Sequence, residues 1–129
     1  AIIINFSGHP LTDLQREQLE REVYIEELIE FPVHFDAYQD MEAQVMRVLE
    51  EVGLAVEEWS ERNIYLILSG IAPGGAALLA AIHGLRGAFP KVVWVYQESR
   101  DPAQYEVAQI INLQALRDNA RKVRATQGS

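Results

Sequence analysis

Residues 64–79 read IYLILSGIAPGGAALL, an apolar run followed by small residues and then by leucines. The run over 64–68 is short, bulky and uncharged, which is typical of a strand buried on both faces. Leu78 and Leu79 begin an apolar pattern with helical spacing. A strand, a glycine-bearing loop and a helix in this order can direct free backbone N–H groups at an anion, usually a phosphate.

The loop over residues 69–75 allows two interpretations. Pro73 suits a first helical turn, where the N–H that proline lacks has no partner, and Gly74 and Gly75 leave the backbone open to a ligand. The loop lacks the Lys and Ser/Thr of a P-loop and the spacing of a dinucleotide-binding motif. The alternative is a tight turn whose glycines only ease packing, and the loop taken alone favours it.

Length and composition indicate one globular domain over residues 1–129. Hydrophobic residues make up 49% of the chain and charged residues 23%, which are ordinary values for such a domain. We find no run near the ~20 apolar residues that cross a bilayer, no signal peptide and no cysteine. These features predict a cytoplasmic protein that uses no membrane anchor, disulfide or cysteine nucleophile.

The chain is acidic, with a formal net charge of −8 and a pI near 4.8. This balance argues against binding of long DNA or RNA, because such binding depends mainly on neutralising phosphates with Lys and Arg. A small anionic ligand needs only a local group of donors, which an acidic protein can provide.

Hydrophobic periodicity and turn residues define the other expected elements. Thr12 and Gln15 form a capping box that starts the first helix, and Gly53 ends the second. We expect a connector over 54–63 and a turn over 98–104, with Gly84 and Gly87 closing the third helix. The expected strands cover 2–6, part of 24–33, 64–68, 91–96 and 105–111, and the expected helices start near 13, 38, 73 and 112.

This order predicts a three-layer, Rossmann-like α/β domain. We expect a mostly parallel five-stranded sheet in the order 2-1-3-4-5, with a C-terminal antiparallel hairpin strand. Strands one and three then form a switch point, where ligands bind outside the carboxyl ends of the strands. The loops expected there, 7–10 and 69–75, are both small, polar and glycine-bearing, which favours a phosphate-bearing ligand over the packing interpretation.

His9 is the candidate catalytic residue. It follows the first strand, and a histidine suits proton transfer near neutral pH, although an ordinary loop histidine is an equally good interpretation. His34 and Asp36 with a distant His83 do not form a metal site, so no metal is expected. A triad of Ser7, His9 and Asp36 lacks the usual nucleophile turn and is disfavoured.

The expected last helix combines an apolar face with four basic residues. We expect its inner face to consist of Leu113, Leu116, Ala120 and Val123. Its basic residues suit a helix C-terminus, and a positive rim supplied across a subunit interface is the less favoured alternative. They are Arg117, Arg121, Lys122 and Arg124.

Five segments identify a family resemblance: NFSGHPLT at 5–12, PVHFD at 32–36, LAAIHGLRGAFP at 79–90, YEVA at 105–108 and INLQA at 111–115. With these segments the chain resembles small CRISPR-associated accessory proteins of type III systems. Those proteins are related in fold to CARF domains, which sense cyclic oligoadenylates, and are grouped with ring nucleases. In CARF domains a two-fold dimer holds the ligand with the loops equivalent to 7–9 and 69–75, although this chain lacks their Lys after the glycines.

The resemblance implies a homodimer, or a higher homo-oligomer, that binds cyclic tetra-adenylate without a cofactor and lowers its level. It also implies possible slow, metal-independent ring cleavage with His9 as the base. The alternatives are a true ring nuclease that gives linear 2′,3′-cyclic-phosphate products, and a flavodoxin-like interaction module that binds no nucleotide. The residues expected to bind the ligand are Asn5, Ser7, Gly8, His9, Ser69, Gly70, Pro73, Gly74 and Gly75.

Overall fold

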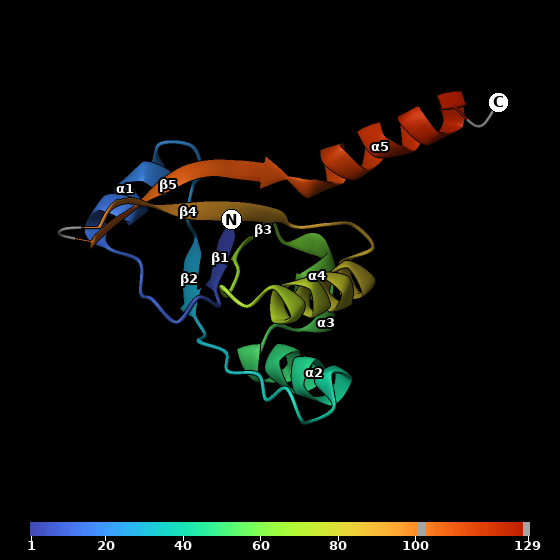
Figure 1. Cartoon of the computed structure of the whole chain (residues 1–129), viewed down its shortest axis with the longest axis horizontal. Coiled ribbons are helices and arrows are strands. Elements are labelled where there is room, and N and C mark those ends of the chain that lie inside the picture. The colour runs from blue at the N-terminus through green and yellow to red at the C-terminus, as the bar shows by residue number, and fades with distance from the viewer. Residues whose placement is uncertain (101–102, 128–129) are drawn as a thin grey trace.

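The computed structural model describes residues 1–100 and 103–127, and the side chains within these ranges except those of 97–100 and 103. Strands and helices alternate through most of the chain before a terminal hairpin and helix (Figure 1). The elements are β1 (Ile2–Asn5), α1 (Asp13–Glu20), β2 (Glu27–Glu30), α2 (Met41–Val52), α3 (Val56–Glu61), β3 (Ile64–Ile67), α4 (Ala72–Arg86), β4 (Lys91–Arg100), β5 (Ala103–Asn112) and α5 (Leu113–Gln127).

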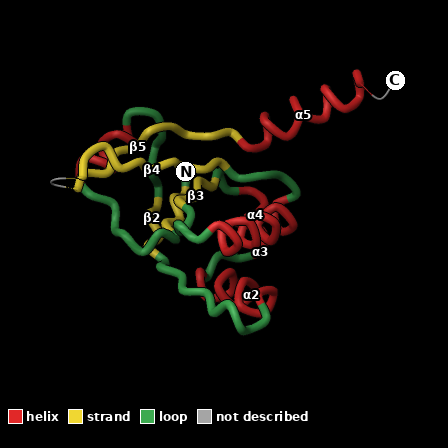
Figure 2. Tube along the Cα trace, in the orientation of Figure 1, coloured by secondary structure: helices red, strands yellow, loops and turns green. Residues whose placement is uncertain are grey.

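The described strands form one sheet in the order β2-β1-β3-β4-β5. The first three pairings are parallel and the β4–β5 pairing is antiparallel. The predicted α/β class, strand order and terminal hairpin are therefore confirmed. Since Leu66 of β3 is in register with Val92, the rest of β4 extends past the carboxyl end of β3 (Figure 2).

Alternate strand residues point to opposite faces of the sheet and build two apolar cores. Ile2 and Ile4 face the side covered by α2, α3 and α4, whereas Ile3 faces the side covered by α1. Burial on both faces explains the uncharged sequences of β1 and β3. The sheet thus lies between two helical layers, as predicted.

The local signals at helix ends act as the sequence indicates. Thr12 and Gln15 form the capping box of α1, and Gly53 ends α2 with a φ of 85°. Asp40 caps α2 through the N–H of Ala43 at 3.1 Å, so this helix begins at Met41 rather than near residue 38. Among the described helices, none combines the length and the apolar character needed to cross a membrane.

Three sequence-based expectations about element boundaries are wrong. The connector predicted over 54–63 contains α3, a six-residue helix anchored by buried Trp59. Gly84 lies inside α4, and Gly87 alone ends that helix. The turn predicted over 98–104 is strand in its described part, because 98–100 belong to β4 and 103–104 to β5. Asp101 and Pro102 lie outside the described residues.

Helix α5 also differs from expectation. It starts at Leu113, close to the predicted position, but none of its described residues is buried. Leu116 and Val123, predicted to face the core, are each 60% exposed. The helix leaves the end of β5 and extends away from the rest of the molecule (Figure 1).

Candidate ligand-binding site

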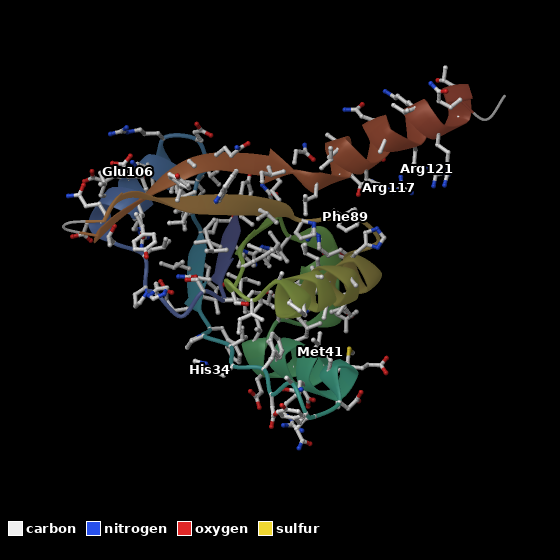
Figure 3. The ribbon with its side chains drawn as sticks, in the orientation of Figure 1. His34, Met41, Phe89, Glu106, Arg117 and Arg121 are labelled. Atoms are coloured by element: carbon white, nitrogen blue, oxygen red, sulfur yellow. The ribbon has the colours of Figure 1, made fainter. Side chains whose placement is uncertain are left out.

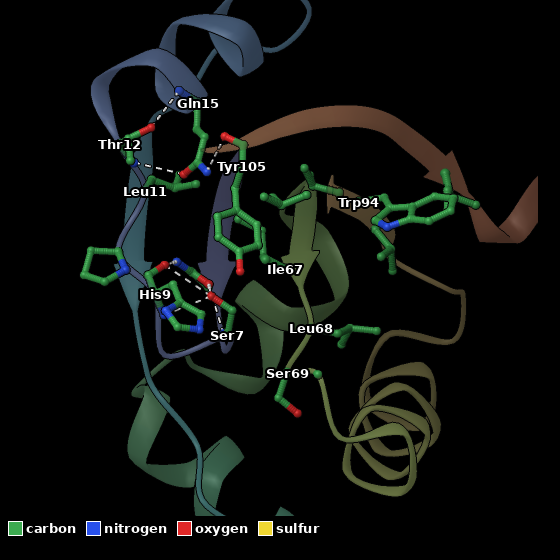
Figure 4. A pocket seen from close by; sticks show the side chains of 17 residues that line it. Ser7, His9, Leu11, Thr12, Gln15, Ile67, Leu68, Ser69, Trp94 and Tyr105 are labelled. Atoms are coloured by element: carbon green, nitrogen blue, oxygen red, sulfur yellow. Dashed lines mark hydrogen bonds between the residues drawn. The ribbon is translucent and has the colours of Figure 1, made fainter. Parts of the chain in front are cut away.

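A pocket of about 550 Å³ lies where β1 and β3 end, beside the part of β4 and β5 that extends past them (Figure 4). The loops over 7–10 and 69–70 both contribute to it, although they are far apart in the sequence. Its lining residues are Asn5, Ser7, His9, Pro10, Leu11, Thr12, Gln15, Ile67, Leu68, Ser69, Gly70, Val92, Val93, Trp94, Val95, Tyr105 and Ile111.

The Asn5 side chain supports the loop over residues 7–10 through hydrogen bonds. Its side chain is buried, and its Nδ2 donates to the His9 carbonyl at 2.8 Å and to Glu30 Oε2 at 2.7 Å. Its Oδ1 accepts from the backbone N–H of Ser7 at 3.0 Å and from the Ser7 hydroxyl at 2.6 Å. Asn5 thus acts mainly on the backbone that a ligand would meet, and the Ser7 hydroxyl is already engaged.

The first loop and the hairpin meet at an aromatic pair. The rings of His9 and Tyr105 are stacked, with centroids 6.3 Å apart and planes inclined by 14°. Gln15 fixes this arrangement, because its Nε2 donates to the Tyr105 carbonyl at 3.0 Å while its Oε1 accepts from Thr12 N–H. The capping box of α1 therefore also positions β5 over the pocket.

The second loop, over residues 69–70, contains a polar group that has no hydrogen-bond partner among the described residues. The Ser69 hydroxyl is buried and has no hydrogen-bond partner among the described residues. Gly70 is exposed, and a Cβ built on it would meet nothing within 4 Å. Two residues later α4 begins, so the positive end of that helix dipole lies beside this part of the pocket.

The other predicted ligand contacts lie outside the pocket lining. Pro73, Gly74 and Gly75 belong to the first turn of α4, and both glycines are buried. The N–H of Gly75 donates to the Ile71 carbonyl at 3.0 Å, as an ordinary helical N–H does. Gly8 has a φ of 81° and shapes the turn between Ser7 and His9. These four residues shape the course of the backbone and do not form the pocket surface.

The pocket is lined by neutral groups. The described lining contains no Lys, Arg, Asp or Glu, and its apolar wall is formed by residues such as Ile67, Leu68 and Val92. Among the described side chains, no carboxylate forms an ion pair with the His9 imidazole or orients it as a base. Within the same residues, no group of three His, Asp or Glu side chains is placed to hold a metal ion.

Sequence reasoning missed the hairpin contribution, in particular Trp94 and Tyr105. Both are aromatic residues that remain about half exposed, at 48% and 45%. Their position depends on the length of the hairpin and on register irregularities after Trp94 and after Gln97. The available signal was a final pair of strands, with aromatic residues at 94, 96 and 105, that is longer than the strand before it.

The pocket therefore joins neutral hydrogen-bonding groups, stacked aromatic rings and a helix N-terminus at one edge of the sheet. Such a mostly apolar pocket with a few polar groups is typical of small-molecule sites. Comparison with protein families, with curated proteins and with solved structures finds no match to this chain.

Proposed function

We propose that this pocket binds cyclic tetra-adenylate and that the protein lowers the free concentration of this second messenger in type III CRISPR antiviral signalling. The observation that supports the proposal best is the meeting of the 7–10 and 69–70 loops in one pocket at the switch point of the sheet. These are the segments through which the family resemblance implies ligand binding in a CARF-like domain.

The aromatic side of the pocket suits an adenine base. Single-stranded nucleotides are commonly held by stacking of bases on aromatic side chains, which contributes about 1–3 kcal/mol per base. Tyr105 and His9 present stacked rings, and Trp94 adds a third aromatic side chain to the lining. The apolar wall beside them excludes water from the face of a bound base.

The opposite side suits a phosphate. Gly70 lets a ligand approach the backbone, the Ser69 hydroxyl has a hydrogen bond to offer, and α4 directs its positive end toward this loop. Without a lysine or arginine in the described lining, the attraction to phosphate comes from oriented neutral donors. Recognition would then depend on shape and stacking more than on net charge.

The ring is larger than an ordinary small-molecule ligand, and it has approximate two-fold symmetry. A pocket of about 550 Å³ suits part of such a ring. Two copies of the protein, related by a two-fold axis, would place two pockets around one ring and match its symmetry. The proposal therefore includes a homodimer or a higher homo-oligomer as the binding species.

Cleavage of the ring is a second possible outcome at the same site. A ribose 2′-oxygen would attack the adjacent phosphorus, lose its proton to a base and expel the 5′-oxygen, which takes up a proton. The product would end in a 2′,3′-cyclic phosphate. His9 lies at the pocket, but among the described side chains no carboxylate is hydrogen-bonded to its ring, so the geometry favours binding over catalysis.

The first experiment is a thermal-shift screen with adenylate rings of three, four and six units, and with linear tetra-adenylate as the control. We expect the four-membered ring to raise the melting temperature most, because a ligand at 100 times its Kd adds about 2.7 kcal/mol. No shift with any ring would contradict the proposal and favour the interaction module.

A second experiment separates binding from cleavage. Labelled ring is incubated with excess protein without metal, the protein is denatured, and the nucleotide is analysed by chromatography. Recovery of intact ring supports sequestration alone. Linear product ending in a cyclic phosphate would identify a ring nuclease, and a His9→Ala variant would then test the role of the imidazole.

A further inference from the structure

Among the described residues, the hydrogen bonds that attach helix α5 to the rest of the molecule lie at its first turn. Asn112 Oδ1 accepts from Ala115 N–H at 3.0 Å, and Gln114 Oε1 accepts from Phe89 N–H at 2.9 Å. Beyond this turn the helix extends away from the rest of the molecule (Figure 1), and this extended part carries Arg117 and Arg121 (Figure 3). Its described residues from Ala115 onward are all exposed.

An isolated helix of this length is marginally stable in water, so packing normally contributes most of its stability. One face of α5 is apolar, because Leu116, Ala120 and Val123 follow one another at i, i+4 and i+7. All three side chains are exposed, and Leu116 and Val123 are each 60% exposed. This face is therefore suited to a partner that the single chain does not supply.

The charge of α5 is opposite to that of the rest of the chain. The helix holds four basic residues and one acidic residue, whereas the remainder holds seven basic and eighteen acidic residues. Within the helix the only ion pair among the described residues joins Arg117 to its neighbour Asp118. Pairing of α5 with another α5 would bring like charges together, so an acidic surface is the better complement.

The outer face of α2 provides such a surface. Met46 is 50% exposed and lies one turn from Glu42 and one turn from Glu50. Neither glutamate forms an ion pair among the described residues. Arg47 and Glu51 are also exposed on α2, farther round the helix from Met46.

We infer that α5 of one copy of this protein docks across α2 of a second copy. Leu116 and Val123 would cover Met46, while Arg117, Arg121 and Arg124 would lie against Glu42 and Glu50. The two helices match in length, at roughly 22 Å for α5 and roughly 18 Å for α2. This contact does not depend on the proposed nucleotide site and forms without ligand.

The test measures association of the ligand-free chain by sedimentation velocity at low salt, where charge pairs are least screened. We expect the wild type to associate at high concentration. Two variants should each be monomeric: one with Arg117→Glu, Arg121→Glu and Arg124→Glu on α5, and one with Glu42→Lys and Glu50→Lys on α2.

An equal mixture of the two variants should associate again, because each chain then offers the charge that the other lacks. A control with Glu17→Lys and Glu22→Lys makes the same change in net charge away from α2 and should associate like the wild type. Far-ultraviolet circular dichroism of each variant checks that the fold is intact.

A monomeric wild type would overturn the inference, and so would continued association of the α5 variant alone. Failure of the mixture to associate would overturn the assignment of α2 as the receptor. If the wild type is monomeric and the α5 variant loses affinity for cyclic tetra-adenylate, the basic helix serves the nucleotide instead, which also overturns the inference while leaving the proposed function in place.

Discussion

A Cβ atom placed on Gly74 would lie 2.5 Å from Cδ2 of Phe35, a distance that side-chain carbons do not reach without displacement. The first turn of α4 is thus packed directly against the segment that leads into α2. The sequence predicts that the open backbone at Gly74 contacts a ligand; in the fold, its missing side chain makes room for the Phe35 ring. This relationship gives the first prediction.

Gly74→Ala should lower the stability of the protein by about 1–3 kcal/mol, as overpacking in a filled core does. Gly84→Ala is the matched control, because it lies in the same helix with nothing within 4 Å of a new Cβ. It should raise stability by up to about 1 kcal/mol through helix propensity. Urea unfolding measures both, and equal midpoints for the two variants would contradict the packing account.

Asn5→Asp should destabilise the protein by about 2–4 kcal/mol although it hardly changes the side chain's shape. The new oxygen would face the His9 carbonyl and Glu30 Oε2, where Nδ2 now donates at 2.8 and 2.7 Å. These neighbours disfavour the charged form, so the new carboxyl would have a raised pKa in the folded protein. The loss of stability caused by Asn5→Asp should therefore become smaller as the pH falls from about 7.5 to about 5.

The control for this prediction is Asn63→Asp, which makes the same change at an exposed side chain. It should leave the unfolding midpoint within about 0.5 kcal/mol of the wild type. Equal stability of the two variants at neutral pH would show that Asn5 does not organise the loop over 7–10.

Arg86→Leu should cost about 2–4 kcal/mol, because two carbonyls would lose a charged donor. Arg86 Nη1 donates to the Trp59 carbonyl at 2.6 Å and to the Arg62 carbonyl at 2.8 Å, which ties α4 to the end of α3. Burial lowers the pKa of this guanidinium, yet it stays charged at neutral pH.

Arg16→Leu is the control for Arg86, since Arg16 forms only an exposed ion pair with Glu20 at 2.8 Å. Such surface pairs contribute about 0–1 kcal/mol, so its unfolding midpoint should change little. A loss for Arg16→Leu as large as that for Arg86→Leu would contradict the proposed tie between the two helices.

Tyr105→Ala should weaken binding of cyclic tetra-adenylate about 5- to 150-fold if its ring stacks on an adenine. Tyr105→Phe keeps the ring and should bind nearly as well as the wild type. Tyr38→Ala removes a tyrosine that is 96% exposed and outside the pocket, and should have no effect on affinity. Isothermal titration calorimetry measures the affinity of the three variants. Unchanged affinity for Tyr105→Ala would show that the Tyr105 ring does not stack on the ligand.

The class of the fold was predictable because its signals are local. Uncharged runs at β1 and β3, the capping box at Thr12 and the glycine at 53 each act within a few residues of where they occur. Together they indicate alternating strands and helices, and connection rules then limit the strand order. Helix α3 was not predicted because a six-residue helix with one buried side chain, that of Trp59, shows no periodic pattern of apolar residues.

The site was only partly predictable because its remaining parts depend on distant packing. The sequence indicated that the loops over 7–10 and 69–70 meet at the switch point, and the structure places both at one pocket. Nothing local to Gly74 reveals that Phe35 packs against it. The same holds for Tyr105, whose place beside His9 depends on the hairpin register and on Gln15.

The helix at 113–127 shows the limit of periodicity most clearly. Its apolar spacing places Leu116 and Val123 on one side of the helix, but the prediction that this side is buried is wrong for the single chain. The pattern does not say whether the chain itself or another molecule covers that side. In this structure the side is exposed, and the basic residues of the helix are the reason to propose an acidic partner surface.

The most direct test of the central claim is a calorimetric titration of cyclic tetra-adenylate into the wild type, Gly70→Tyr and Gly84→Tyr. Both glycines leave open space for a side chain, and neither has a positive φ, so both variants should fold. Only Gly70 lines the pocket. We expect Gly84→Tyr to bind like the wild type and Gly70→Tyr not to bind. Equal binding by all three proteins, or no binding by the wild type, would show that the ligand does not occupy this pocket.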